Sequence, residues 1–173
     1  MAKRPYHHGN LRVALLDAGR LALETSGPAS LSLRGLARAV GVAAPSVYNH
    51  FARLETLTLA LAEDGFAELG AVLEKAGPDP LAIGLAYLGF ARQNPGLYRL
   101  MFGEGRRDGS PEGAALRARR QAAFAPLLAR VGSREAALHH WALVHGLASL
   151  VIDGQVPLGP DPESQLREIL AWP

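Results

Sequence analysis

Apolar residues recur at helical spacing along nearly the whole chain, and no stretch alternates apolar and polar residues as a half-buried strand would. Glycine and proline interrupt the pattern, and Asn10, Ser32 and Ser133 stand where a helix needs an N-cap. We therefore predict an all-α fold. The expected helices span about residues 10–26, 33–40, 53–76, 80–93, 95–103, 111–131, 134–153 and 162–171, with a short one around Pro45 and a polar, glycine-rich loop over 103–113.

The length suits one medium-sized domain, or a small module joined to a second unit. Of the 173 residues 49% are apolar, and none is cysteine, which excludes disulfides, thiolate zinc sites and cysteine nucleophiles. A lack of cysteine is typical of a reducing compartment. We accordingly expect a cytoplasmic protein.

Two segments bear on membrane association. Residues 1–10 are basic and polar, and no apolar segment with a cleavage site follows them, so no signal peptide is expected. Residues 136–152 carry no Asp, Glu, Lys or Arg, and they approach the length of a transmembrane helix. They contain His139, His140 and His145, however, which are costly at the centre of a bilayer. We expect a buried helix and no membrane partner.

Charge is distributed unevenly along the chain. Residues 1–55 hold seven Lys or Arg and three acids, whereas the remainder holds eleven Lys or Arg and thirteen acids. A basic N-terminal part on a slightly acidic body suits a module that binds a polyanion.

Residues 33–51 have the spacing of a helix-turn-helix. Ala37 falls where two helices would cross closely, so a larger side chain would push them apart. Gly41 falls where the chain must turn sharply, and glycine readily takes the left-handed conformation this requires. Val47 would point from the next helix into a small core. The other expected members of that core are Leu33, Leu36, Val40, Val42 and Phe51.

The opposite side of this third helix carries small and polar residues, as a helix needs to enter a major groove. They are Ala43, Ala44, Ser46, Tyr48, Asn49 and His50. The same spacing occurs in tight helical hairpins that bind no DNA. Two other classes therefore remain open on spacing alone, a small all-helical enzyme and a helical bundle that binds other proteins.

The run from Leu36 to Phe51 resembles the DNA-binding signature of the TetR family of bacterial regulators. Residues 11–23 and 27–34 are similar to that family's first helix and the entry to its second, and the likeness extends over about residues 9–60. It implies an N-terminal three-helix helix-turn-helix DNA-binding domain over residues 1–52. It also implies a C-terminal helical-bundle domain for dimerisation and ligand sensing over residues 53–173.

The resemblance further implies which residues touch double-stranded DNA. The predicted set is Ser32, Arg34, Ala43, Ala44, Pro45, Ser46, Tyr48, Asn49, His50 and Arg53. Tyr48 and His50 would contact DNA phosphates, and Ser32 and Arg34 would help to anchor the DNA backbone. For Tyr48 the alternative is a partly buried position in the small core. The small residues and Asn49 would face base edges, which specify sequence, whereas phosphate contacts position the protein.

One position departs from the family pattern. The family usually has a phosphate-contacting lysine where this chain has Leu54, and the neighbouring Arg53 is the candidate replacement. Lys3, Arg4, His7 and His8 form either a flexible DNA-binding arm or a solvated tail.

The C-terminal part resembles one subgroup of TetR-like sensor domains, the WHG type, through residues 94–102 and 141–146. That likeness implies a homodimer and a small-molecule effector. Aromatic and apolar side chains are the candidates for lining the ligand pocket, with plain core packing as the alternative for each. They are Tyr87, Phe90, Tyr98, Met101, Phe102, Phe124, Trp141 and His145.

The helix expected over residues 134–153 has two apolar stripes, and a surface helix of a monomer needs only one. One stripe is Leu138, Trp141, Ala142, His145 and Ile152; the other is Leu143, Leu147, Leu150 and Val151. Pairing with the last two helices of a second copy would cover the spare stripe.

No constellation of catalytic residues stands out, since there is no nucleophile elbow, phosphate-cradling loop or convincing carboxylate pair. Among His139, His140 and His145 no pair has the i, i+4 spacing of a helical chelate. We expect no enzyme activity, no cofactor and no metal.

The sequence thus predicts a sequence-specific DNA-binding transcriptional regulator. In the most specific form of this hypothesis, a small, largely apolar effector releases a repressor dimer from a palindromic operator. Coupling would run through the helix over residues 53–76, because a shift there would change the distance between the two recognition helices.

Overall fold

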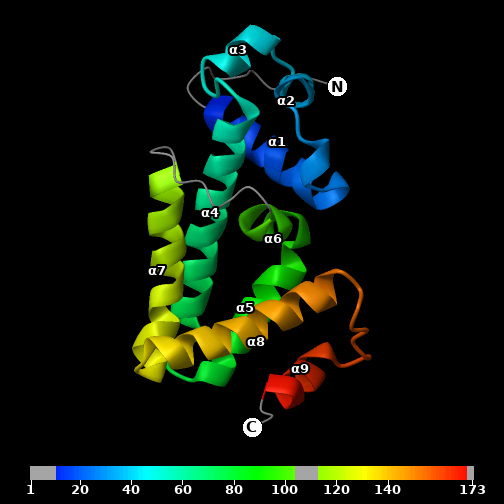
Figure 1. Cartoon of the computed structure of the whole chain (residues 1–173). Coiled ribbons are helices and arrows are strands. Elements are labelled where there is room, and N and C mark those ends of the chain that lie inside the picture. The colour runs from blue at the N-terminus through cyan, green and yellow to red at the C-terminus, as the bar shows by residue number, and fades with distance from the viewer. Residues whose placement is uncertain (1–10, 104–112, 171–173) are drawn as a thin grey trace.

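The computed structural model describes residues 11–103 and 113–170, and within these ranges every regular element is a helix. The predicted all-α fold is therefore confirmed. In chain order the elements are α1 (Leu11–Ser26), the short 3-10 helix η2 (Pro28–Ser30), α2 (Leu33–Val40), α3 (Ala44–Tyr48), α4 (Leu54–Lys75), α5 (Pro80–Gln93), α6 (Pro95–Phe102), α7 (Gly113–Val131), α8 (Arg134–Ile152) and α9 (Pro162–Leu170). Figure 1 shows α1–α3 at one end of the molecule and α5–α9 at the other, joined by α4.

Local chemistry sets the helix ends. The Ser32 hydroxyl accepts the N–H of Gly35 at 3.1 Å, and the Ser133 hydroxyl accepts that of Ala136 at the same distance. Both predicted N-caps are thus confirmed. The predicted cap at Asn10, the N-terminal arm and most of the predicted 103–113 loop lie outside the described residues.

The longest helix, α4, runs through the middle of the molecule. It packs along α7, and it also contacts α5, α6 and α1. Small residues allow these close approaches: a Cβ added at Gly70 would lie 3.4 Å from the Cα of Ala123 on α7. Phe66, on the same helix, is 2% exposed and lies in the shared core. One continuous hydrophobic core therefore joins the two ends of the chain.

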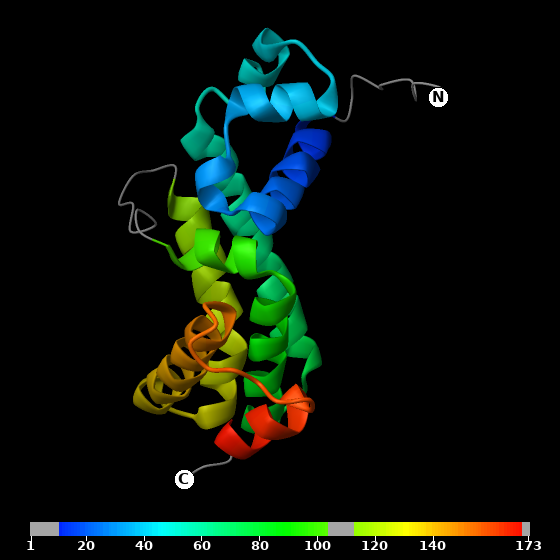
Figure 2. The ribbon, with the colours of Figure 1, turned by 90° about the vertical axis from the view of Figure 1, so that its right-hand side faces the viewer.

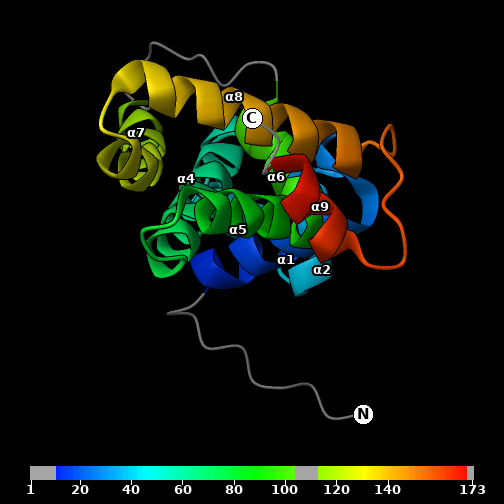
Figure 3. The same ribbon diagram turned by 90° about the horizontal axis from the view of Figure 1, so that it is seen from below.

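Two shorter helices complete the arrangement. Figure 2 shows α6 lying directly beneath α1, and the two helices are in contact. Figure 1 shows α8 passing in front of α5, and Figure 3, seen from below, shows α9 beside α5; α5 contacts both helices. In the part of the chain that the structure describes, no helix is both long enough and apolar enough to cross a bilayer.

Candidate nucleic-acid interface and ligand cavity

The α2–α3 hairpin has the core that its spacing predicts. Val47 is fully buried, and Ala37 and Phe51 are each 3% exposed. Gly41 has φ 78°, in the left-handed region, and the next N–H, of Val42, donates to the carbonyl of Ala37 at 2.9 Å. The predicted close crossing, turn and core residue of the helix-turn-helix are therefore confirmed.

The residues predicted to touch DNA lie on the outside of this hairpin. Ser32, Arg34, Ala43, Pro45, Tyr48, Asn49, His50 and Arg53 are exposed, and Ala44 and Ser46 are partly exposed. Tyr48 is 46% exposed, which removes the alternative that it is a core aromatic. The helix is shorter than expected, because α3 ends at Tyr48; Asn49 and His50 lie in the turn that follows it. This surface forms the tip of the molecule (Figure 1).

Two cations, one at the start of α4 and one on α1, lie near this hairpin. Arg53 is the N-cap of α4 and is exposed, whereas Leu54 is partly buried against the core. The guanidinium of Arg12, on α1, lies 5.5 Å from the centroid of the Phe51 ring, a cation–π contact. Sequence reasoning counted Arg12 only in the net charge, since nothing along the chain links it to Phe51.

A polar network joins α1 to α6. The carboxylate of Glu24 accepts the N–H groups of Gly96 and Leu97, each at 2.9 Å, so it caps the N-terminus of α6 from another helix. Arg20 donates to Glu68 on α4 at 2.9 Å and to the side-chain oxygen of Asn94 at 2.8 Å. A Cβ added at Gly96 would collide with the carbonyl of Leu23. Only glycine lets α6 approach α1 this closely.

A cavity of about 780 Å³ lies among α4, α5, α7 and α8, a size typical of small-molecule sites. Four of the eight predicted pocket residues line it: Tyr87, Phe102, Phe124 and Trp141. Tyr98 and His145 lie next to the lining residue Tyr87. Phe90 and Met101 do not line it; both are core residues, 4% and 2% exposed.

Tyr87, Tyr98 and His145 form a hydrogen-bonded triad from α5, α6 and α8. The two hydroxyls lie 3.1 Å apart, and they lie 2.9 and 2.6 Å from Nδ1 of His145. Burial raises the pKa of Tyr87 and raises that of Tyr98 to about 12, and burial lowers the pKa of His145. All three side chains are therefore neutral at pH 7, and they satisfy one another.

Sequence reasoning missed four polar residues that line the cavity. They are Asp79, Arg120, Gln121 and Arg134. Their side-chain types are common on exposed helix faces, so no signal in the sequence separates them from ordinary surface residues.

Apolar residues make up much of the exposed faces of α7 and α8. On α8 the exposed apolar residues are Leu138, Ala142, Leu143, Gly146 and Leu150; on α7 they are Ala114, Ala115, Ala118, Ala122, Ala125, Leu128 and Ala129. The predicted division of α8 into two stripes was wrong in detail. Leu147 is buried and Val151 packs against the core, because α8 meets α5 through the row of Val144 and Ala148.

Family models match most of the chain. Residues 15–61 match "Bacterial regulatory proteins, tetR family", and residues 81–171 match "Tetracyclin repressor-like, C-terminal domain".

Individual relatives agree with these matches. The HTH-type transcriptional regulator Rv1816 of Mycobacterium tuberculosis is 28% identical over 112 residues, 60% of this chain and 48% of that protein, so the match spans about half the length of that curated relative. A solved protein of unknown function from a Rhodococcus species is 30% identical, with a TM-score of 0.79 over 97% of this chain and 93% of the other. The TetR family transcriptional regulator PfmR of Thermus thermophilus is 25% identical, with a TM-score of 0.62 over 90% and 94%.

Proposed function

Because the chain belongs to the TetR family of bacterial regulatory proteins, we propose that it is a sequence-specific DNA-binding transcriptional regulator of the bacterial cytoplasm and not an enzyme. In its most specific form, the proposal is a homodimeric repressor that a small, largely apolar effector releases from a palindromic operator. Residues 1–52 would form the DNA-binding domain, and residues 53–173 the dimerisation and sensing domain.

The observation that carries the proposal is the outer surface of the α2–α3 hairpin. Its core side is closed by Val47 and Ala37, while the other side presents exposed small and polar residues on α3 and the turn after it. Such a surface fits a major groove without steric obstruction. Tyr48 and His50 are placed for phosphates and Asn49 for a base edge in this proposal.

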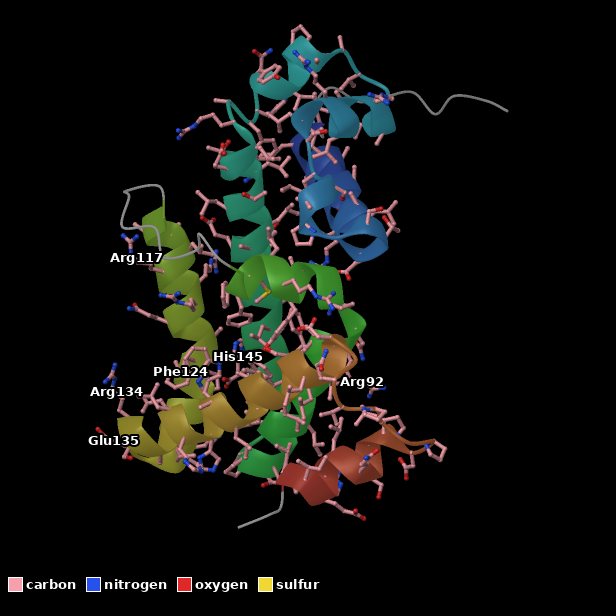
Figure 4. The ribbon with its side chains drawn as sticks, turned by 45° about the vertical axis from the view of Figure 1, so that its right-hand side comes forward. Arg92, Arg117, Phe124, Arg134, Glu135 and His145 are labelled. Carbon is pink, nitrogen blue, oxygen red and sulfur yellow. The ribbon has the colours of Figure 1, made fainter. Side chains whose placement is uncertain are left out.

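DNA binding is tested with the purified full chain and duplexes selected by that protein from a random pool. Tyr48→Ala removes a phosphate contact, so affinity falls for all selected sequences. Asn49→Ala removes a base contact, so preference changes at particular base positions, by roughly 1–3 kcal/mol if the contact is bidentate. Arg92→Ala is the control, because Arg92 is an exposed residue of α5, far from α3 (Figure 4). Unchanged affinity and preference in both folded variants would refute the assignment.

The homodimer is supported by the exposed apolar faces of α7 and α8. Water contact with two such faces is unfavourable, and a two-fold pairing would cover them with the same residues of a second copy. We assign α7 and α8 to this pairing rather than the last two helices, because the outer side of α9 carries the polar residues Glu163, Ser164, Arg167 and Glu168. A dimer would also place two recognition surfaces on a palindromic site.

Release by an effector is supported by the cavity and by its position. Phe102 of α6 lines the cavity, and the other end of α6 is held by Glu24 of α1. A ligand that moves α6 or α4 would therefore displace α1–α3 in each subunit, and both recognition surfaces must fit one operator.

An effector that separates the two states by about 1–3 kcal/mol changes operator affinity about 5–150-fold, and DNA weakens effector binding equally. Apolar metabolites and drugs that raise the melting temperature are titrated against the protein–DNA complex. Compounds that stabilise the protein and leave operator affinity unchanged would show that the cavity is not a sensor.

A further inference from the structure

We infer that the cavity takes an organic anion, whose acid group binds Arg120 and Arg134 while its apolar body occupies the space between α4 and α8. This inference deepens the proposed function, since it rests on the cavity being the effector site.

The walls of the cavity are apolar and aromatic. α4 contributes Phe66, Leu69 and Leu73, and Phe124 of α7 meets Trp141 of α8 edge to face, with ring centroids 5.6 Å apart. Burial of a flat or extended hydrocarbon against such walls is favourable in proportion to the apolar area covered. The body of the ligand is therefore hydrocarbon, aromatic or aliphatic.

Two guanidinium groups, one from α7 and one from α8, are among the groups that line the cavity. Arg120 comes from α7 and Arg134 is the first residue of α8; both are exposed. In the described ranges neither has a carboxylate within ion-pair distance. Figure 4 shows Arg134 at the outer end of α8, with Phe124 between it and His145 in that view.

The lining has one carboxylate, and it already has a structural role. Asp79 accepts the N–H of Leu81 at 3.1 Å, which caps α5. A cationic ligand is poorly suited to this site, because it would face two guanidinium groups of like charge and the single carboxylate is already engaged in the helix cap. An arginine fork instead binds a carboxylate, sulfonate or phosphate through two parallel hydrogen bonds, and a neighbouring apolar wall strengthens that attraction.

The lining residue Tyr87 offers no charge to a ligand. Its hydroxyl is already paired with Tyr98 and His145. No fully buried polar side-chain atom lacks a partner in the described part of the chain. The arginines are therefore the cations available to the acid group, and the hydrocarbon lies against the apolar and aromatic walls.

The test uses two fluorescent probes with the same apolar body. Anilinonaphthalene sulfonate carries an acid group, and phenyl-naphthylamine lacks it. Fluorescence titration of the full chain gives a dissociation constant for each, and their ratio isolates the contribution of the acid group. In the R120Q/R134Q variant we expect the dissociation constant of the anionic probe to rise about ten-fold relative to that of the neutral probe, because the acid group loses its ion pairs with both arginines. R119Q/R130Q is the matched control, because it removes two exposed arginines of α7 that do not line the cavity.

Three outcomes overturn the inference: an unchanged ratio in R120Q/R134Q, an equal shift in the control, or failure of wild-type protein to bind the anionic probe. Retention on selected duplex DNA is measured on the same preparations. An anion preference that R120Q/R134Q leaves unchanged, with DNA binding intact, would refute this inference alone, whereas absence of DNA binding by wild-type protein would refute the proposed function.

Discussion

The contact between Glu24 and the start of α6 makes a sharp prediction for Glu24→Gln. The carboxylate uses both oxygens, one for the N–H of Gly96 and one for that of Leu97. Glutamine has nearly the same shape, but it has one acceptor oxygen, and its NH₂ group would face an N–H. One charge-assisted hydrogen bond and the attraction of a negative charge to a helix N-terminus are therefore lost.

The magnitude follows from the environment of Glu24. A hydrogen bond to a charged group contributes about 1.5–3 kcal/mol when it is shielded from water. The Glu24 side chain is 25% exposed, so we take about 2 kcal/mol as the loss of unfolding free energy. For a chain of this size that corresponds to a decrease in melting temperature of about 4–8 °C.

The measurement is urea unfolding at fixed protein concentration, because the stability of the proposed dimer would depend on concentration. Glu68→Gln is the matched control: its carboxylate pairs with Arg20 across the same junction but is 50% exposed, so its loss costs only about 0.2–1 kcal/mol. If Glu24→Gln and Glu68→Gln lower the unfolding free energy equally, within about 0.5 kcal/mol, the capping argument is wrong.

Two further predictions concern α8. Gly146→Leu puts a bulky side chain on the exposed face, where nothing lies within 4 Å of a Cβ in the monomer. In the proposed dimer this side chain overpacks the interface at about 1–3 kcal/mol per subunit, so the dimer dissociation constant measured by sedimentation rises at least about thirty-fold. Gly89→Leu on α5 is the control and leaves the dissociation constant unchanged. The second prediction concerns the pH dependence of stability. In the unfolded chain His145 takes up a proton at its ordinary pKa of about 6.5, whereas burial lowers the pKa of His145 in the folded protein. The unfolded state therefore binds more protons below about pH 6.5, and the unfolding free energy falls as the pH drops through this range. Relative to wild type, His145→Gln flattens this slope by up to about 1.4 kcal/mol per pH unit, and parallel stability curves for the two proteins would contradict the assignment.

The local features were predictable because each depends on residues near one another in the chain. The caps at Ser32 and Ser133 and the left-handed Gly41 follow from side-chain and backbone chemistry within four residues. The buried position of Val47 follows from helical spacing alone. Only the length of the third helix was overestimated, since α3 ends at Tyr48.

The features that depend on distant packing were not predictable. Aromatic residues at helical spacing suit either a cavity or a solid core, so spacing could not separate Phe124, which lines the cavity, from Phe90, which does not. The pairing of Glu24 with Gly96 joins positions 72 residues apart. For the same reason the contact of α6 with α1, which the proposed coupling uses beside α4, could not be predicted.

The contact of α6 with α1 also orders events during protein synthesis. Glu24 leaves the ribosome 72 residues ahead of Gly96, and at about 5–20 residues per second this is an interval of about 4–14 s. Once Tyr48 has also emerged, the whole α2–α3 hairpin is outside the ribosome for the rest of this interval, yet α1 still lacks the helix that packs against the backbone of Leu23. We therefore expect a nascent chain or degradation product that ends before Pro95 to carry the proposed DNA-binding surface in a less stable form, more open to proteases than the same surface in the finished protein.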